Sequence, residues 1–110
     1  MLLLTEFDFH PTLAQSIGVS LVLFSGPDCG TCRQVEKLLP QCVEGMVSAL
    51  YKVDVQQSTA LAREYEVFHL PALFMFVDGA YHALLHSEAT PAKLRQVIEN
   101  ALALPAEDEP

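Results

Sequence analysis

Two short runs of apolar residues constrain the fold more than any other feature of this sequence. Residues 20–25 read SLVLFS and residues 72–77 read ALFMFV, and each run is followed by residues that favour a turn. A continuous apolar run of this length is typical of a strand that is buried on both faces of a sheet. The two runs therefore predict the centre of a covered β-sheet.

Helical and strand-like patterns alternate around these two runs. Pro40 is expected to kink or split the longest helical pattern, because proline removes one hydrogen bond of the helix. Asp78-Gly79 is typical of a tight hairpin turn. Because parallel strands need crossover helices, the order predicts an α/β fold in which a central mixed β-sheet is flanked by helices. The expected helices are residues 11–16, 29–47, 58–65 and 91–104, and the further strands are residues 2–5, 49–55 and 81–87.

The length and charge of the chain limit its organisation and its partners. It has 110 residues, of which 51% are hydrophobic, and this suits one domain with its own core. The formal net charge is −8, so a nucleic-acid partner is not expected, because phosphate binding requires clustered Lys and Arg. The acidic end of the chain predicts a domain over residues 1–104 and a disordered acidic tail over residues 105–110.

No segment has the pattern of a targeting or membrane sequence. The first four residues are apolar, but Glu6 and Asp8 follow closely and no basic region precedes them. No apolar run approaches the roughly 20 residues that a membrane-spanning helix needs. We therefore expect a cytoplasmic protein that does not bind a membrane. In such a reducing compartment, a close cysteine pair is typical of catalysis or metal binding rather than of a structural bridge.

Cys29 and Cys32 form the motif that carries chemistry, at the point where a predicted strand and turn end and a helix begins. The first turn of a helix presents unpaired N–H groups and a partial positive charge, which both stabilise a thiolate. The thiolate is the nucleophile in disulfide exchange. In this turn the Cys29 sulfur is expected to point outward and the Cys32 sulfur inward. Cys29 is therefore the predicted nucleophile, and Cys32 the residue that resolves the mixed disulfide.

The third cysteine and the histidines do not complete a metal site. Cys42 is in helical phase with Leu38 and Met46, and we expect it to be a buried apolar residue. A zinc site needs three or four converging ligands. His82 and His86 share a strand face, but four residues of strand separate them by about 13 Å. No metal is therefore expected, and without a glycine-rich phosphate loop no nucleotide or flavin cofactor is implied.

The segments around the cysteine pair and the second apolar run resemble the thioredoxin family. Residues 21–32, LVLFSGPDCGTC, are similar to the family's strand, loop and start of the active-site helix. Residues 66–79, EVFHLPALFMFVDG, resemble its second signature, in which a proline precedes a buried strand. The resemblance extends over roughly residues 2–104. It implies a three-layer α/β/α thioredoxin fold and thiol-disulfide oxidoreductase activity.

The resemblance also implies which residues contact a substrate. Pro71 matches the family's cis-proline, which lies against the cysteine pair, and the backbone of Leu70 is implied to pair with an extended substrate. His69 either borders this site, where it would stabilise the Cys29 thiolate or contact substrate, or is an exposed loop histidine without a role. The substrate-binding residues expected on these grounds are Gly30, Thr31, His69, Leu70 and Pro71.

The chain departs from the family's pattern at four positions beside the motif. Asp28 replaces the tryptophan that usually precedes the first cysteine, and its carboxylate opposes a thiolate at Cys29. Thr31 replaces the proline that is common at this position in the family, which implies that the Cys29–Cys32 pair is a weaker reductant. Leu23 takes the place of the buried aspartate that serves as proton acceptor, and Lys52 matches the lysine that partners this aspartate. Lys52 is therefore expected to lack a partner, and the proton acceptor of Cys32 is unassigned.

Two classes of function are consistent with these observations. The first is an oxidoreductase in cell redox homeostasis, which exchanges dithiol and disulfide with protein substrates through Cys29 and Cys32. Its only redox centre is the Cys29–Cys32 disulfide, and its electrons are expected to come from a reductase or another thiol donor. A monomer is the favoured oligomeric state. The second is an interaction or accessory module whose cysteine pair is dispensable, which the departures and the acidic charge favour. The cysteines together with Pro71 favour the enzyme, because exchange chemistry requires both sulfurs.

Overall fold

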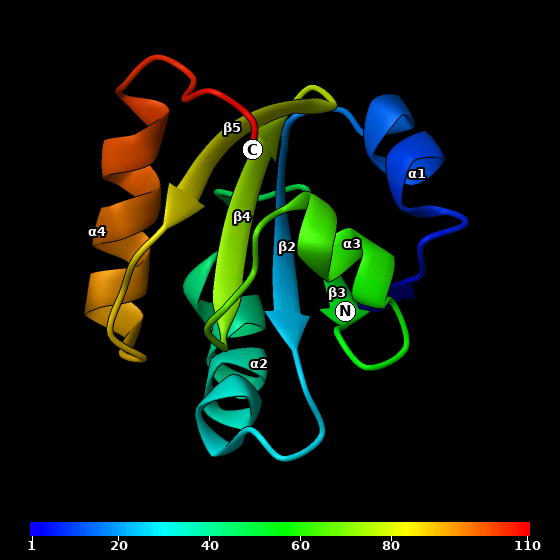
Figure 1. The fold of residues 1–110 in the computed structure, drawn as a ribbon. Helices are drawn as coiled ribbons and strands as arrows, with labels where there is room; N and C mark the ends of the chain where they lie inside the picture. The colour runs from blue at the N-terminus through cyan, green and yellow to red at the C-terminus, as the bar shows by residue number, and fades with distance from the viewer.

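The structure is a computed structural model that describes residues 1–110. Strands and helices alternate in the order β-α-β-α-β-α-β-β-α, as the sequence patterns predict (Figure 1). The strands are β1 (Leu2–Leu4), β2 (Val19–Ser25), β3 (Ala49–Asp54), β4 (Ala72–Val77) and β5 (Ala80–Leu85), and the helices are α1 (Phe9–Gln15), α2 (Gly30–Cys42), α3 (Thr59–Glu64) and α4 (Pro91–Leu102).

The five strands form one mixed sheet in the order β1-β3-β2-β4-β5. Strands β1, β3 and β2 are parallel, whereas β4 is antiparallel to β2, and β5 is antiparallel to β4. The two apolar runs, β2 and β4, are thus neighbours at the centre of the sheet, where both of their faces are covered. Asp78 and Gly79 have φ angles of 50° and 83° and join β4 to β5 in the predicted hairpin.

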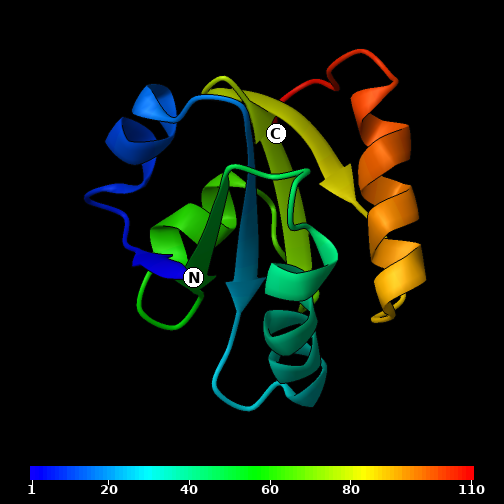
Figure 2. The same cartoon turned by 180° about the vertical axis from the view of Figure 1, so that it is seen from behind.

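One face of the sheet is covered by α2 and α4 (Figure 2). Successive residues of a strand point to opposite faces, so Leu21 and Leu23 of β2 point to this side. They pack with Val35 and Leu39 of α2 and with Leu94 of α4. This core holds α2, which carries the cysteine pair, against the middle of the sheet.

The opposite face is covered by α1 and α3 and is rich in aromatic residues (Figure 1). Phe9 of α1 is fully buried, and its ring centroid lies 5.4 Å from that of Tyr65 and 6.3 Å from that of Phe24. Rings at these separations add edge and offset contacts to the free energy of apolar burial. The two cores and the sheet together make the predicted three-layer α/β/α fold.

Two predicted helix boundaries are wrong. Helix α1 begins at Phe9 instead of residue 11, because Pro11 falls in its first turn, where a backbone N–H needs no partner within the helix. Helix α2 is not split at Pro40 and does not continue to residue 47. It ends at Cys42 with Pro40 in its last turn, and Gly45, with a φ of 83°, follows in the turn that leads to β3.

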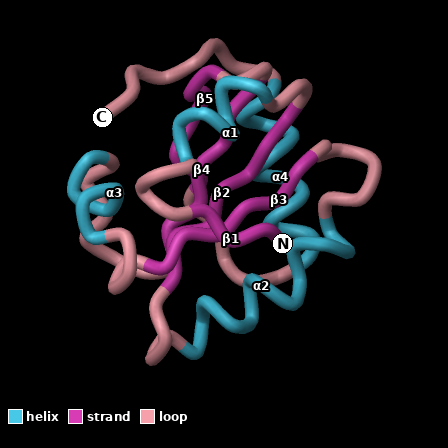
Figure 3. The backbone as a smooth tube through the Cα atoms, turned by 90° about the vertical axis from the view of Figure 1, so that its right-hand side faces the viewer, coloured by secondary structure: helices cyan, strands magenta, loops and turns pink.

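Residues 105–110 form no helix or strand, but they lie against the domain (Figure 3). The Glu107 N–H donates to the carbonyl oxygen of His82 at 2.7 Å, and Oε1 of Glu107 accepts from the Leu84 N–H at 3.1 Å. The Tyr65 hydroxyl donates to Oε2 of Glu109 at 2.7 Å. The acidic tail therefore covers part of the edge strand β5, and the domain boundary at residue 104 stays a prediction.

Candidate active site

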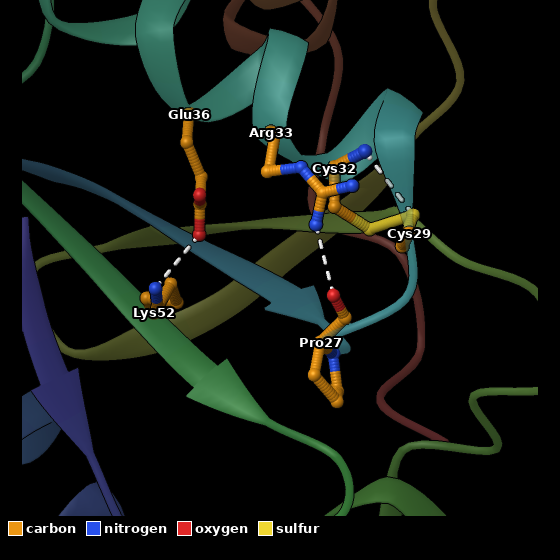
Figure 4. The surroundings of a disulfide bond; sticks show 6 residues. All are labelled: Pro27, Cys29, Cys32, Arg33, Glu36 and Lys52. Atoms are coloured by element: carbon orange, nitrogen blue, oxygen red, sulfur yellow. Dashed lines mark hydrogen bonds and ion pairs between the residues drawn. A yellow bond between two sulfur atoms is a disulfide. The ribbon is translucent and has the colours of Figure 1, made fainter.

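The two cysteines of the motif open helix α2. Cys29 is the N-cap residue, and its Sγ accepts a hydrogen bond from the backbone N–H of Cys32 at 3.1 Å. A sulfur therefore occupies the place where a Ser or Asp oxygen usually satisfies a free N–H of the first turn. The two cysteines are joined by a disulfide, with their Cα atoms 5.2 Å apart (Figure 4). The spacing of three thus brings the sulfurs into bonding contact.

The two cysteines differ in exposure in the predicted direction. Cys29 is half-buried, whereas Cys32 is 1% exposed. The residues between them, Gly30 and Thr31, are exposed. No atom lies within 4 Å of a Cβ built on Gly30, so nothing blocks the approach to Cys29 from this side.

The loop before Cys29 is closed by an arginine from the helix. Nη1 of Arg33 donates a hydrogen bond to the carbonyl oxygen of Pro27 at 2.8 Å (Figure 4). The backbone N–H of Cys29 also donates to the carbonyl oxygen of Gly26 at 3.3 Å. These contacts tie the loop to the first turn of α2, so that Cys29 has a defined position between them.

A cis peptide bond precedes Pro71, as the resemblance implied. Strand β4 is antiparallel to β2, with Ala72 opposite Phe24, so the residues just before β4 lie beside the loop that follows β2. A Cβ built on Gly26 would lie 3.1 Å from Cδ1 of Leu70. The Pro71 loop and the cysteine loop are therefore in contact.

A groove of about 200 Å³ lies beside Pro71. The exposed apolar side chains of Phe68 (83% exposed) and Leu70 (36%) stand beside it. His69 is exposed and lines the groove together with Phe68, Pro71 and His86.

A second hollow of about 220 Å³ lies at the buried cysteine. Oε1 of Glu36 lies 2.8 Å from Nζ of Lys52, and both residues line this hollow (Figure 4). Glu36 is on α2, one turn after Cys32, and Lys52 is on β3. We call this hollow the Cys32 pocket, and it is lined by Ser25, Gly26, Pro27, Cys32, Arg33, Glu36, Lys52 and Asp54.

Comparison with known proteins identifies the family. The family model for Thioredoxin matches residues 1–100. The chain belongs to the thioredoxin family. Thioredoxin of Staphylococcus aureus strain Mu50 / ATCC 700699, like that of strain MW2, is 35% identical over 78 residues, which make up 68% of this chain and 72% of the relative. The structure of the zinc-bound form of human ERp44 has a TM-score of 0.75 and 17% identity, covering 90% of this chain and 30% of that chain, and supports the fold.

Family, fold and cysteine pair together show a thiol-disulfide oxidoreductase of the thioredoxin type. Among the departures from the family's pattern, Asp28 is exposed in the loop before Cys29. Leu23 is fully buried in the core beneath α2 and α4. Strand β2 of this thioredoxin-family protein therefore carries no carboxylate at residue 23.

The expectation that Lys52 lacks a partner in this thioredoxin-family protein is wrong. Glu36 supplies the partner from α2 instead of from the sheet. The sequence contains a signal for this residue, because Glu36 is four residues after Cys32 and so lies on the same face of the helix. That spacing does not indicate Lys52, however, because the pair forms only when α2 packs on the sheet face that carries Lys52.

The remaining ligand candidates lie apart from the redox site of this thioredoxin-family protein. Cys42 is a free cysteine, 4% exposed, in the core between α2 and the sheet, as predicted. His82 Nε2 lies 2.8 Å from the carbonyl oxygen of Ala101, and His10 pairs with Glu64 at 2.9 Å. No three His, Cys, Asp or Glu side chains converge as metal ligands. No helix is long and apolar enough to cross a bilayer.

Proposed function

We propose that this protein exchanges disulfides with protein substrates, with Cys29 as the nucleophile and Cys32 as the resolving thiol. The observation that carries the proposal is the unequal exposure of two bonded sulfurs at a helix start. Cys29 is half-buried and accessible to a partner, while Cys32 is 1% exposed and is bonded to Cys29. The unpaired N–H groups of the first turn favour the thiolate at Cys29.

In the reducing direction, the Cys29 thiolate attacks one sulfur of a substrate disulfide, and the other substrate sulfur leaves as a thiolate. The Cys32 thiolate then attacks Cys29 Sγ, which forms the internal disulfide and releases the second substrate thiol. Two electrons pass from the cysteine pair to the substrate. A reductase or another thiol donor returns them, and no cofactor other than the cysteine pair takes part.

The substrate is proposed to bind along the Pro71 loop. The groove beside Pro71 is lined by the exposed side chain of Phe68, and the exposed Leu70 is next to Pro71 in the chain; both suit an extended, partly apolar peptide. Leu70 directly precedes Pro71 and strand β4, and His69 lines the same groove. We propose a cytoplasmic monomer in cell redox homeostasis that acts on such peptides.

The proposal is tested by insulin reduction and by trapping of partners. The wild type is expected to reduce insulin disulfides, Cys29→Ser is expected to be inactive, and Cys32→Ser is expected to accumulate mixed disulfides. Cys42→Ala is the matched control, because this third cysteine is buried in the core, and it is expected to keep the activity.

Absence of trapped partners, under conditions in which a Staphylococcus aureus thioredoxin captures them, would contradict the proposal. It would favour the accessory module with a dispensable cysteine pair. A double Cys29→Ser/Cys32→Ser variant that still performs the protein's role in the cell would support the same conclusion.

A further inference from the structure

The resolving step requires a proton acceptor for Cys32, and strand β2 does not supply one. Cys32 is 1% exposed, and its thiol must lose a proton before it can attack Cys29. On β2, Leu23 is fully buried and Ser25 lines the hollow at Cys32, and neither side chain carries a carboxylate or an imidazole. The proton of the Cys32 thiol must therefore reach its acceptor by a route that does not depend on a side chain of β2.

The Cys32 pocket is such a route. Its volume of about 220 Å³ is large enough for several water molecules, since each occupies about 30 Å³ in the liquid. The charged side chains that face it are Arg33 and Glu36 from α2 and Lys52 and Asp54 from β3. Of these, only the two carboxylates can take up a proton.

Glu36 is the better placed of the two carboxylates. It follows Cys32 by one helical turn on the same face. Its Oε1 is held by Lys52 Nζ at 2.8 Å, and its Oε2 has no hydrogen bond within the protein. Asp54 stands at the end of β3, where its Oδ1 already accepts the Gln56 N–H at 2.8 Å.

We propose that Glu36 accepts the proton of the Cys32 thiol through water in the Cys32 pocket, and that Lys52 positions the Glu36 carboxylate for this transfer. The inference rests on the proposed exchange function and names a residue that this reaction would need. The carboxylate thus comes from α2, and its position is set by the packing of that helix on the sheet.

The step balances without any further reactant. In the mixed disulfide, the proton of Cys32 Sγ passes through water to Glu36. The Cys32 thiolate attacks Cys29 Sγ, the bond between Cys29 and the substrate sulfur breaks, and its electron pair leaves on that sulfur. The proton on Glu36 then passes to the departing thiolate or to solvent.

The experiment separates the resolving step from the first attack. Reduced protein is mixed with a chromogenic aryl disulfide, and release of the second aryl thiol is followed from pH 6 to pH 9. We expect Glu36→Gln to slow this release by about tenfold or more near neutral pH. The deficit is expected to shrink as pH rises, because hydroxide then replaces the carboxylate as acceptor. Alkylation of Cys29 by iodoacetamide is expected to change less than about twofold.

Glu44→Gln is the matched control, because it removes the same charge at an exposed position just beyond α2. It is expected to release the aryl thiol at the wild-type rate. A Glu36→Gln variant with the wild-type rate at every pH would overturn the proposal. An equal slowing of release and alkylation would also overturn it, because it would indicate a structural effect. If Asp54→Asn slows release of the second aryl thiol as much as Glu36→Gln does, the assignment of Glu36 as the proton acceptor would be overturned.

Failure of the proposed function would give a different experimental result from failure of the role of Glu36. If the wild type itself neither reduces insulin nor releases the second aryl thiol, the exchange chemistry is wrong. If the wild type is active and Glu36→Gln is unchanged, only the role of Glu36 is wrong.

Discussion

Leu23 and Lys52 are direct neighbours across the parallel strands β2 and β3. Leu23 is fully buried, while the Lys52 ammonium reaches past it to Glu36 on α2, 2.8 Å away. The ion pair is therefore placed at the wall of the Cys32 pocket, and the interior of the sheet beneath α2 stays apolar.

The first prediction concerns a carboxylate at residue 23. Leu23→Asp is expected to lower the free energy of unfolding by about 3 kcal/mol or more at pH 7, because a buried carboxylate lacks a free cation there. Burial raises the pKa of such a carboxyl. The protonated form is therefore favoured in the fold, and stability falls as pH rises above the unfolded value of about 3.9.

Leu23→Asn is the matched control, because it has the same shape but does not titrate. Urea unfolding of both variants between pH 4 and pH 8 is expected to show a pH-dependent loss in the aspartate variant alone. Equal stability of the two variants at pH 8 would mean that Lys52 leaves Glu36 for the new carboxylate.

The second prediction concerns the aromatic core under α1. Phe9 is fully buried between Phe24, Tyr65 and Phe76. Phe9→Ala is expected to cost about 3–5 kcal/mol in the free energy of unfolding, since it removes a buried ring and leaves a cavity. Phe7→Ala is the control, because Phe7 is 87% exposed, and we expect a change below about 0.5 kcal/mol. Similar losses in both variants, measured by urea unfolding, would contradict the packing described.

The third prediction concerns the hairpin between β4 and β5. Gly79 has a φ of 83°, and a Cβ built on it would lie 2.7 Å from the carbonyl oxygen of Leu13 and 3.0 Å from that of Ala14. Gly79→Ala is therefore expected to lower the free energy of unfolding by about 1–3 kcal/mol or more, through strain and a backbone clash. Gly30→Ala, which meets no atom within 4 Å, is expected to unfold at nearly the wild-type urea concentration. Thermal or urea unfolding that ranks the two in the opposite order would refute this.

The fourth prediction concerns two tyrosines near the acidic tail. Burial, and then the charges of Glu107 and Glu109, raise the pKa of Tyr81 to about 12. Burial, and then the hydrogen bond to Glu109, raise the pKa of Tyr65 well above its usual range. A raised folded pKa contributes stability that is present below the unfolded value of about 10 and is lost as pH rises through the folded value. Stability is therefore expected to fall from about pH 10 through pH 12.

Ultraviolet titration of tyrosinate and urea unfolding at alkaline pH test this behaviour. Glu107→Gln/Glu109→Gln is expected to lower the pKa of both Tyr65 and Tyr81, because it removes charges that oppose the phenolates. Glu99→Gln, on the exposed side of α4, is expected to leave the titration unchanged. An identical titration curve for the tail variant would show that the tail does not lie against these tyrosines.

Local patterns were sufficient for the order of elements and for much of the site. The apolar runs of β2 and β4 predict central strands, because only a strand covered on both faces tolerates such composition. The place of Cys29 and Cys32 at a helix start follows from neighbouring residues, and so does the burial of Cys42 from its helical phase. These features depend on interactions within a few residues, which the sequence alone determines.

Contacts between distant segments were decided only by the tertiary structure. Lys52 meets Glu36 because α2 packs on the sheet face that carries Lys52, and nothing within either segment indicates this pairing. The docking of Glu107 on β5 and of Glu109 on Tyr65 likewise depends on the direction in which the chain leaves α4. The partner of a long polar side chain depends on how whole helices and strands are placed relative to one another. That placement results from packing helices on both faces of the sheet.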